Sequence, residues 1–142
     1  VQVVIETEFE IISSFVRFSQ GLSNLITNSL TAIDLRFAGH SRNEGCIQIH
    51  ASTSGSDGLI RISDNGVGIP AALQNLVVEP FFTTHRGAHL GLGLTYMERL
   101  VAFAGGQVSV ESIEGEGTIV TIRVPRALPQ PLPVKGRKTT VH

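Results

Sequence analysis

Several residue types are scarce in this chain of 142 residues, and each absence narrows what it can be. There is no Trp, one Met and one Cys, and both lysines lie among the last eight residues. The single Cys46 excludes an internal disulfide, which fits a reducing compartment. No apolar run reaches the length of about 18 residues that a membrane span needs, and no signal peptide opens the chain. We therefore expect a cytoplasmic domain, whether its parent protein is soluble or anchored in a membrane.

The charge is unevenly distributed along the chain. Residues 1–125 carry seven Arg and no Lys against twelve acids, a net charge of −5. Residues 126–142 carry four cations, three prolines and no acid, which predicts an extended linker after a single domain over 1–125. Four cations spread over residues 126–142 are too few to predict a nucleic-acid-binding surface. Because the chain does not begin with Met, we interpret it as part of a longer protein.

Hydrophobic periodicity predicts strands separated by two long helices. Apolar residues that alternate with polar ones predict strands, and apolar residues spaced three and four positions apart predict helices. The expected order is a strand at Val1 to Phe9, a helix at 12–37, a hairpin at 47–64, a short helix at 71–77, a loop at 79–90, a helix ending near Ala104 and a hairpin at 108–124. In the first helix, the apolar stripe is expected to be Leu22, Leu25, Ile26, Leu30 and Ile33. This order predicts an α+β fold, a two-layer sandwich whose mixed, mostly antiparallel sheet has helices on one face.

Two asparagines and an acidic turn are the first candidates for chemistry. Asn24 and Asn28 are four residues apart and share one face of the first helix, where amide oxygens suit a hard cation such as Mg²⁺. Asp64 is the last residue of a predicted strand and lies on the face of that strand that points inward. Gly66 and Gly68 follow it, so a ligand's amino group could approach the carboxylate closely. Taken alone, the asparagines fit ordinary polar positions better than a cation site, and the acidic segment fits a plain turn better than a ligand site.

Two further segments lie between these features and the last hairpin. Gly91-Leu92-Gly93-Leu94 begins the second long helix, whose exposed amide hydrogens and dipole favour phosphate. It is neither a dinucleotide fingerprint, since no strand leads into it, nor a Walker loop, since no Gly-Lys-Ser/Thr occurs. Pro80-Phe81-Phe82-Thr83-Thr84-His85 places two aromatics in an aperiodic loop, as a local anchor or a partner contact.

Together, these segments closely resemble the ATP-binding catalytic domain of sensor histidine kinases, within the wider GHKL group. Asn24 to Ser29 is similar to the family's N box, Asp64 to Pro70 to its G1 box, Pro80 to Thr84 to its F box and Gly91 to Leu94 to its G2 box. The resemblance covers residues 1–125 and implies the Bergerat ATP-binding fold.

The resemblance also implies roles for individual positions. Asn28 would ligate the Mg²⁺ of Mg-ATP, with Asn24 near the same metal or phosphates, while Asp64 would bind the adenine amino group in a pocket shaped by Gly66 and Gly68. A lid at about 82–90 would contribute Thr84 and Arg86, and Gly91, Leu92 and Gly93 would frame the phosphates. His85 and His89 depart from the family pattern, which more often has Lys and Gly there, and we interpret both as lid residues rather than phosphorylation sites.

Asn24 indicates the type of reaction. Hydrolysing GHKL relatives have a similar position occupied by a Glu that activates water, and an amide cannot act as a general base. The pocket therefore resembles one that holds ATP for transfer to another acceptor. In the family, that acceptor is a His on a separate dimerisation hairpin, and a response regulator acts downstream. We therefore expect this chain to be monomeric, to bind ATP and release ADP, and not to phosphorylate itself.

Three other interpretations remain. A GHKL ATPase fragment predicts steady phosphate release. An anti-sigma-factor serine kinase predicts a parent protein without dimerisation helices. A degenerate signalling domain predicts no Mg-dependent nucleotide binding.

Overall fold

The computed structural model describes residues 1–39, 44–74 and 90–128. In these described ranges, five strands and three helices follow one another. They are β1 (Gln2–Ile5), α1 (Phe15–Arg36), β2 (Ile47–Ser54), β3 (Asp57–Asp64), α2 (Ala71–Gln74), α3 (Leu90–Phe103), β4 (Gln107–Ile113) and β5 (Gly117–Pro125). Within these ranges, no helix is long and apolar enough to cross a membrane.

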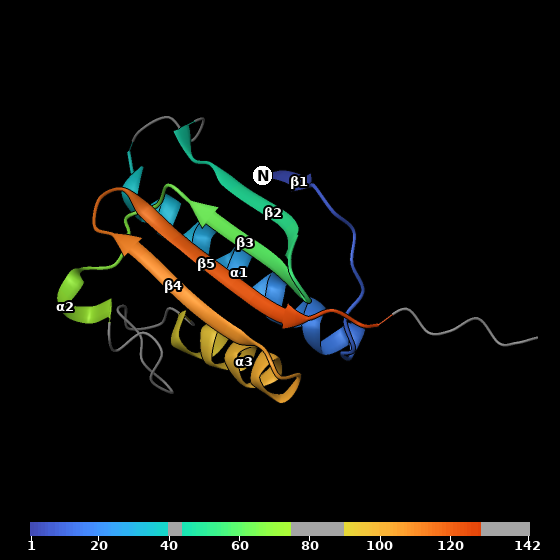
Figure 1. Ribbon diagram of the computed structural model, residues 1–142. Helices are drawn as coiled ribbons and strands as arrows, with labels where there is room; N and C mark the ends of the chain where they lie inside the picture. Colours follow the sequence, from blue (N-terminus) through green and yellow to red (C-terminus); the bar gives the residue numbers. More distant parts are fainter. Residues whose placement is uncertain (40–43, 75–89, 129–142) are drawn as a thin grey trace, which may run out of the picture.

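The strands form one sheet in the order β1-β2-β3-β5-β4. β1 pairs with β2 in parallel, and the other three pairs are antiparallel. Figure 1 shows α1 and α3 lying against the same face of this sheet, with α2 beyond its edge near β4. The predicted two-layer sandwich with a mostly antiparallel sheet is therefore confirmed.

The core lies between this helical layer and the sheet. Its buried apolar side chains come from both long helices and from β2, β3 and β5. They are Leu25, Ile33, Leu94, Met97, Val101, Ile47, Ile62, Ile122 and Val124. Alternation along β2, β3, β4 and β5 sends apolar side chains two residues apart into this layer, which is why these four strands could be recognised in the sequence.

Helix α1 buries the expected stripe except at Leu30, since Leu25 and Ile33 are core residues and Leu22 and Ile26 pack against the core. Its buried residues, Gly21, Leu25, Ser29 and Ile33, are spaced by four, whereas Leu30 is 48% exposed. The prediction for Leu30 is wrong because apolar character alone does not fix the direction of a helix face. The polar Ser29 takes a central place in the stripe, opposite the end of β3.

Strand β1 is shorter than expected. It covers Gln2–Ile5 rather than Val1 to Phe9, and all four of its residues are exposed. The chain then leaves the sheet edge to reach α1, and the acids at Glu6, Glu8 and Glu10 are poorly suited to a buried ladder.

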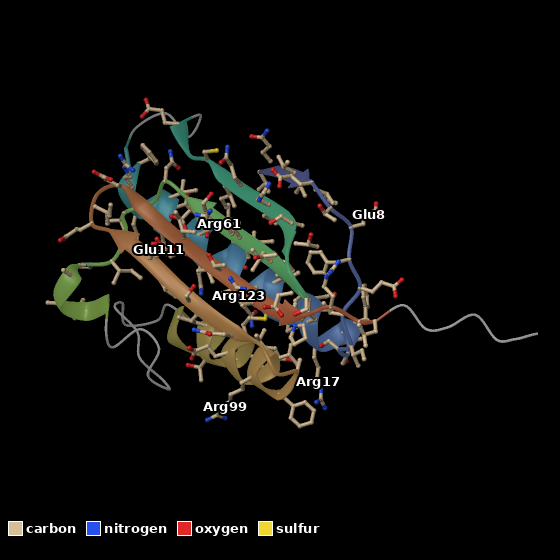
Figure 2. All side chains as sticks on the ribbon, viewed as in Figure 1. Glu8, Arg17, Arg61, Arg99, Glu111 and Arg123 are labelled. Carbon is tan, nitrogen blue, oxygen red and sulfur yellow. The ribbon has the colours of Figure 1, made fainter. Side chains whose placement is uncertain are left out.

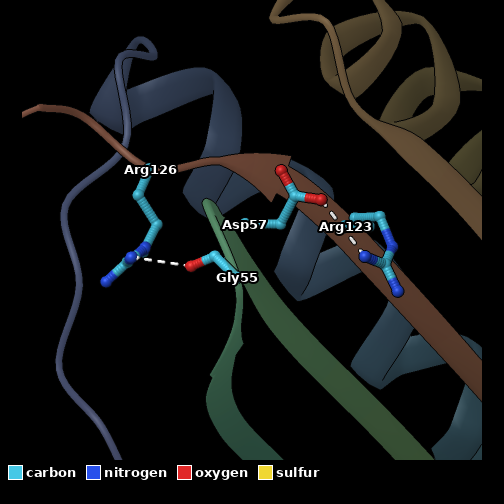
Figure 3. Close-up of polar contacts among 4 residues, drawn as sticks. All are labelled: Gly55, Asp57, Arg123 and Arg126. Carbon is cyan, nitrogen blue, oxygen red and sulfur yellow. Dashed lines mark hydrogen bonds and ion pairs between the residues drawn. The ribbon is translucent and has the colours of Figure 1, made fainter.

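Backbone contacts of the domain continue just past β5. Arg126 N donates to Ser56 O at 3.0 Å, and Ala127 N donates to Glu10 O at 2.7 Å. Figure 3 shows the Arg126 guanidinium on the Gly55 carbonyl at the turn between β2 and β3. Residues 129–142 of the predicted linker lie outside the described residues, so the linker stays a prediction.

Candidate nucleotide site

Asp64 lies at the end of β3, on the helix side of the sheet. Ser29 Oγ donates to its Oδ2 at 2.8 Å, and Gly66 N donates to its Oδ1 at 2.9 Å. Each carboxylate oxygen is therefore held by one donor, and hydrogen bonds to an ionised acceptor are among the stronger ones. The expectation that Asp64 faces inward is confirmed.

Ser29 makes a contact that the sequence patterns above do not predict. It is only 6% exposed and connects α1 to β3 through Asp64. Its spacing of four from Leu25, a core residue, is the signal that could have placed it on the buried row.

The loop after Asp64 is pressed between α1 and the end of β4. A Cβ on Gly66 would lie 2.6 Å from Ala32 Cβ, and a Cβ on Gly68 would collide with the Ile113 carbonyl. Gly68 also has φ +70°, a conformation that side chains rarely adopt. In addition, Val67 N donates to Ala32 O at 2.9 Å. Both glycines are thus required by close backbone approach. We call Ser29, Asp64, Gly66 and Gly68 the G1 cluster.

A hydroxyl pair lies beside this cluster. Thr118 of β5 is the register partner of Asp64, and its Oγ1 lies 2.8 Å from Ser112 Oγ. Ser112 Oγ also accepts from Ile69 N at 2.8 Å. Neither residue was predicted, because only the sheet register brings Thr118 next to Asp64.

The two asparagines lie where α1 crosses α3. A Cβ on Gly93 would lie 3.1 Å from Asn24 Cβ and 3.3 Å from Asn28 Nδ2, so this glycine packs directly against both. Asn24 Oδ1 accepts from Gln20 Nε2 at 3.0 Å. Two distant sequence motifs are therefore brought together as expected, and we call Asn24, Asn28 and Gly93 the crossing cluster.

The two clusters share one helix. Asn28 packs against Gly93 of α3, and its neighbour Ser29 bonds to Asp64 of β3, so adjacent residues of α1 link the amides to the carboxylate. Gly91 and Leu92 lie in the first turn of α3, next to this crossing. The sequence-predicted Thr84 and Arg86, together with Pro80 to His85 and His89, lie outside the described residues.

A metal ion would have few protein ligands here. Over residues 1–39, 44–74 and 90–128, no group of three or more His, Cys, Asp or Glu could hold one. Amide oxygens such as that of Asn28 are suitable for Mg²⁺ when a substrate's phosphates supply further oxygens. The donor set therefore fits a cation that arrives with a nucleotide.

Comparisons with known proteins identify the family of this chain. Residues 14–128 match the family described as histidine kinase-, DNA gyrase B- and HSP90-like ATPases. The chain is 35% identical over 115 residues to the sensor histidine kinase RcsC of Salmonella typhimurium, covering 78% of this chain and 11% of RcsC. It is 34% identical over 110 residues to ZraS of the same organism, covering 77% of this chain and 22% of ZraS.

A solved structure shows the same architecture. The catalytic domain of histidine kinase ThkA, in a nucleotide-free form, superimposes with a TM-score of 0.70 at 25% identity, covering 87% of this chain and 76% of that one. The chain thus spans a small part of its curated relatives but most of an isolated catalytic domain. It belongs to the family of histidine kinase-, DNA gyrase B- and HSP90-like ATPases, as an ATP-binding catalytic domain of the histidine kinase type.

Proposed function

We propose that this domain holds Mg-ATP so that its γ-phosphoryl group passes to a His on a separate dimerisation hairpin of the parent protein. The observation that carries the proposal is that two adjacent residues of α1 link the two clusters: Ser29 bonds to Asp64 of β3, and Asn28 packs against Gly93 of α3. A nucleotide can then be bound by its base at one cluster and by its phosphates at the other.

The G1 cluster is suited to the base. Asp64 accepts hydrogen bonds, and an adenine amino group donates them, so the pair is charge-assisted. Gly66 and Gly68 allow the loop after Asp64 to pack against Ala32 and the Ile113 carbonyl, which fixes the backbone next to the carboxylate. The nearby hydroxyl of Thr118 can contribute through water, since such bridges are almost as favourable as direct contacts.

The crossing cluster is suited to the phosphates. The first turn of α3, with Gly91, Leu92 and Gly93, offers backbone amides and the positive end of a 14-residue helix. Asn28 would hold Mg²⁺, which neutralises charge on the phosphates when bound, and Asn24 would lie close to it. Thr84 and Arg86 would complete the phosphate contacts from the lid.

The side chain at position 24 favours transfer over hydrolysis. Asn24 is an amide that already accepts from Gln20, and it cannot remove a proton from water. Transfer forms a bond from a His nitrogen to the γ-phosphorus and breaks the bond to the β-phosphate oxygen, which leaves ADP. The acceptor hairpin and the response regulator would belong to the rest of the two-component system, while this domain would act as a monomer in the cytoplasm.

Calorimetric titration with ATP and Mg²⁺ tests the binding step. Asp64→Ala should remove measurable binding, and Asn28→Ala should remove the part of the binding that depends on Mg²⁺, while circular dichroism stays unchanged in both variants. Asp57→Ala, at the other end of β3, and Ser23→Ala, on the exposed side of α1, are matched controls and should bind like the wild type. Normal affinity in both site variants would show that the assignment is wrong.

The reaction type needs a second measurement. With Mg-ATP alone, the domain should release almost no phosphate. With the parent's hairpin added, label from the γ-phosphate should appear on the hairpin in a form lost in acid and stable in base, as expected of a phosphorus–nitrogen bond. Steady phosphate release by the domain alone would instead support an ATPase.

A further inference from the structure

Arg36, in the last turn of α1, bonds to the two loops that surround Asp64. Its Nη1 donates to Asn65 O at 2.8 Å and to Glu116 O at 2.9 Å, with Gly66 O at 3.5 Å. These carbonyls belong to the loop after β3 and to the turn between β4 and β5. A guanidinium stays charged at every accessible pH, so these bonds are permanently charge-assisted.

One peptide unit connects Arg36 to Asp64. The Asn65 carbonyl and the Gly66 N–H are the two ends of the same rigid peptide plane. Arg36 bonds to its oxygen, and its N–H donates to Asp64 Oδ1 at 2.9 Å. Hydrogen bonds in such a chain polarise and orient one another. The guanidinium therefore fixes the donor that holds one oxygen of the carboxylate.

The surroundings of Arg36 indicate that it orients the neighbouring loops and does not contribute to the hydrophobic core. Its side chain is exposed, and the guanidinium carbon lies 5.1 Å from the centre of the Phe37 ring. The loops it joins are held independently, because Val67 N donates to Ala32 O and Gly115 N donates to Val67 O at 2.7 Å. Replacing Arg36 should thus leave the fold in place and change how firmly the 65–66 peptide is oriented.

We propose that Arg36 is a positioning residue for base selection: through the 65–66 peptide it fixes the Asp64 carboxylate so that the site prefers a 6-amino purine over a 6-oxo purine. The inference rests on the proposed function, in which Asp64 accepts from the adenine amino group. Arg36 itself does not contact the base.

The selectivity follows from which groups donate and which accept. A carboxylate fixed opposite position 6 is attracted to an amino donor and repelled by an oxo acceptor. A carboxylate free to turn can accept instead from the N1–H that 6-oxo purines carry. Loosening Asp64 therefore costs affinity for the amino purine and costs little for the oxo purine.

Titrations with ATP and inosine triphosphate test this inference, because the two nucleotides differ at position 6. In the presence of Mg²⁺, Arg36→Gln should bind ATP about tenfold more weakly, and inosine triphosphate within about twofold of the wild type. The preference for ATP should therefore fall about tenfold. Arg36→Lys keeps one donor group and should fall in between.

The control is Arg17→Gln, an exposed arginine near the start of the same helix, which Figure 2 places far from the Asp64 end of α1. It should leave both affinities unchanged. Thermal unfolding of each variant reports on the fold.

The outcomes separate the two proposals. If the wild type binds neither nucleotide, the proposed function fails. If the wild type prefers ATP and Arg36→Gln keeps that preference, or loses affinity for both nucleotides equally, Arg36 is only a structural contact and the inference is overturned. Should Arg36→Gln unfold, Arg36→Lys decides: an unchanged preference in a folded lysine variant overturns the inference equally.

Discussion

The two halves of the site are built in different ways. In the G1 cluster, both oxygens of Asp64 are bound by protein donors, and the adjoining loop is packed so closely that only glycine fits at two positions. In the crossing cluster, half-buried amides lie on a helix surface against Gly93. The first half is organised by the fold before any ligand arrives. The second offers oxygens and backbone amides to a ligand that brings its own charge and metal. Base recognition should therefore depend on packing, and phosphate recognition on electrostatics.

The largest effect should come from breaking the packing of the G1 cluster. Gly68→Ala forces a side chain into φ +70° and against the Ile113 carbonyl, and should cost about 2–4 kcal/mol of unfolding free energy. Gly55→Ala is the matched control, with φ +60° and open space around the new Cβ, and should cost about 1 kcal/mol. Urea unfolding measures both, and equal losses would mean that the close packing at Gly68 contributes nothing.

The next effect separates the two halves by their metal dependence. Asp64→Asn should weaken ATP binding about 30-fold to 100-fold whether or not Mg²⁺ is present, since it removes a charged acceptor for the base. Asn28→Ala should abolish the gain in affinity that Mg²⁺ provides and leave metal-free binding nearly unchanged. Calorimetry with and without Mg²⁺ measures both affinities. If the two variants show the same dependence on Mg²⁺, the G1 cluster and the crossing cluster do not bind separate parts of the nucleotide.

A smaller effect should come from the buried hydroxyl that holds Asp64. Ser29→Ala removes the donor to Oδ2, and should weaken ATP about fivefold to tenfold while phosphate contacts persist. Ser23→Ala, on the exposed face of the same helix, is the control. An unchanged affinity for ATP in Ser29→Ala would show that Gly66 N–H alone suffices to orient the carboxylate.

The smallest effect should come from a charge outside both clusters. Desolvation by burial raises the pKa of Glu98 on α3 above its usual value. A raised pKa in the folded state means that ionised Glu98 disfavours folding at neutral pH, and that this cost disappears as the pH falls through the folded pKa. Glu98→Gln should therefore stabilise the domain at pH 7 by a few tenths of a kcal/mol, because solvent screens a partly exposed group. The gain should vanish near pH 4, and ATP affinity should not change.

Much of the fold could be predicted because strands and helices bury alternate or helically spaced side chains. The hairpins, both long helices and the position of Gly93 near the start of α3 follow from such patterns. The wrong predictions concern two features that the local sequence pattern does not determine, namely the direction of a helix face and the length of an edge strand. Leu30 is apolar yet exposed, because the direction of the α1 face depends on the position of the sheet. The extent of β1 depends on where the chain must turn toward α1.

The sequence by itself determined the residues with chemical potential: Asn24, Asn28, Asp64 and the glycines around them, since donor type and the absence of a side chain are properties of each residue. Only the tertiary structure decided how these residues are held. Helical spacing could place Ser29 on the buried row of α1 but could not identify its partner, and Arg36 and Thr118 belong to no local pattern. Each of the three reaches the Asp64 region from an element distant in sequence. Hydrogen bonds and sheet register between distant segments exist only once the chain has folded. For that reason, the candidate binding residues could be predicted from the sequence, whereas the residues that hold them in place could be identified only from the fold.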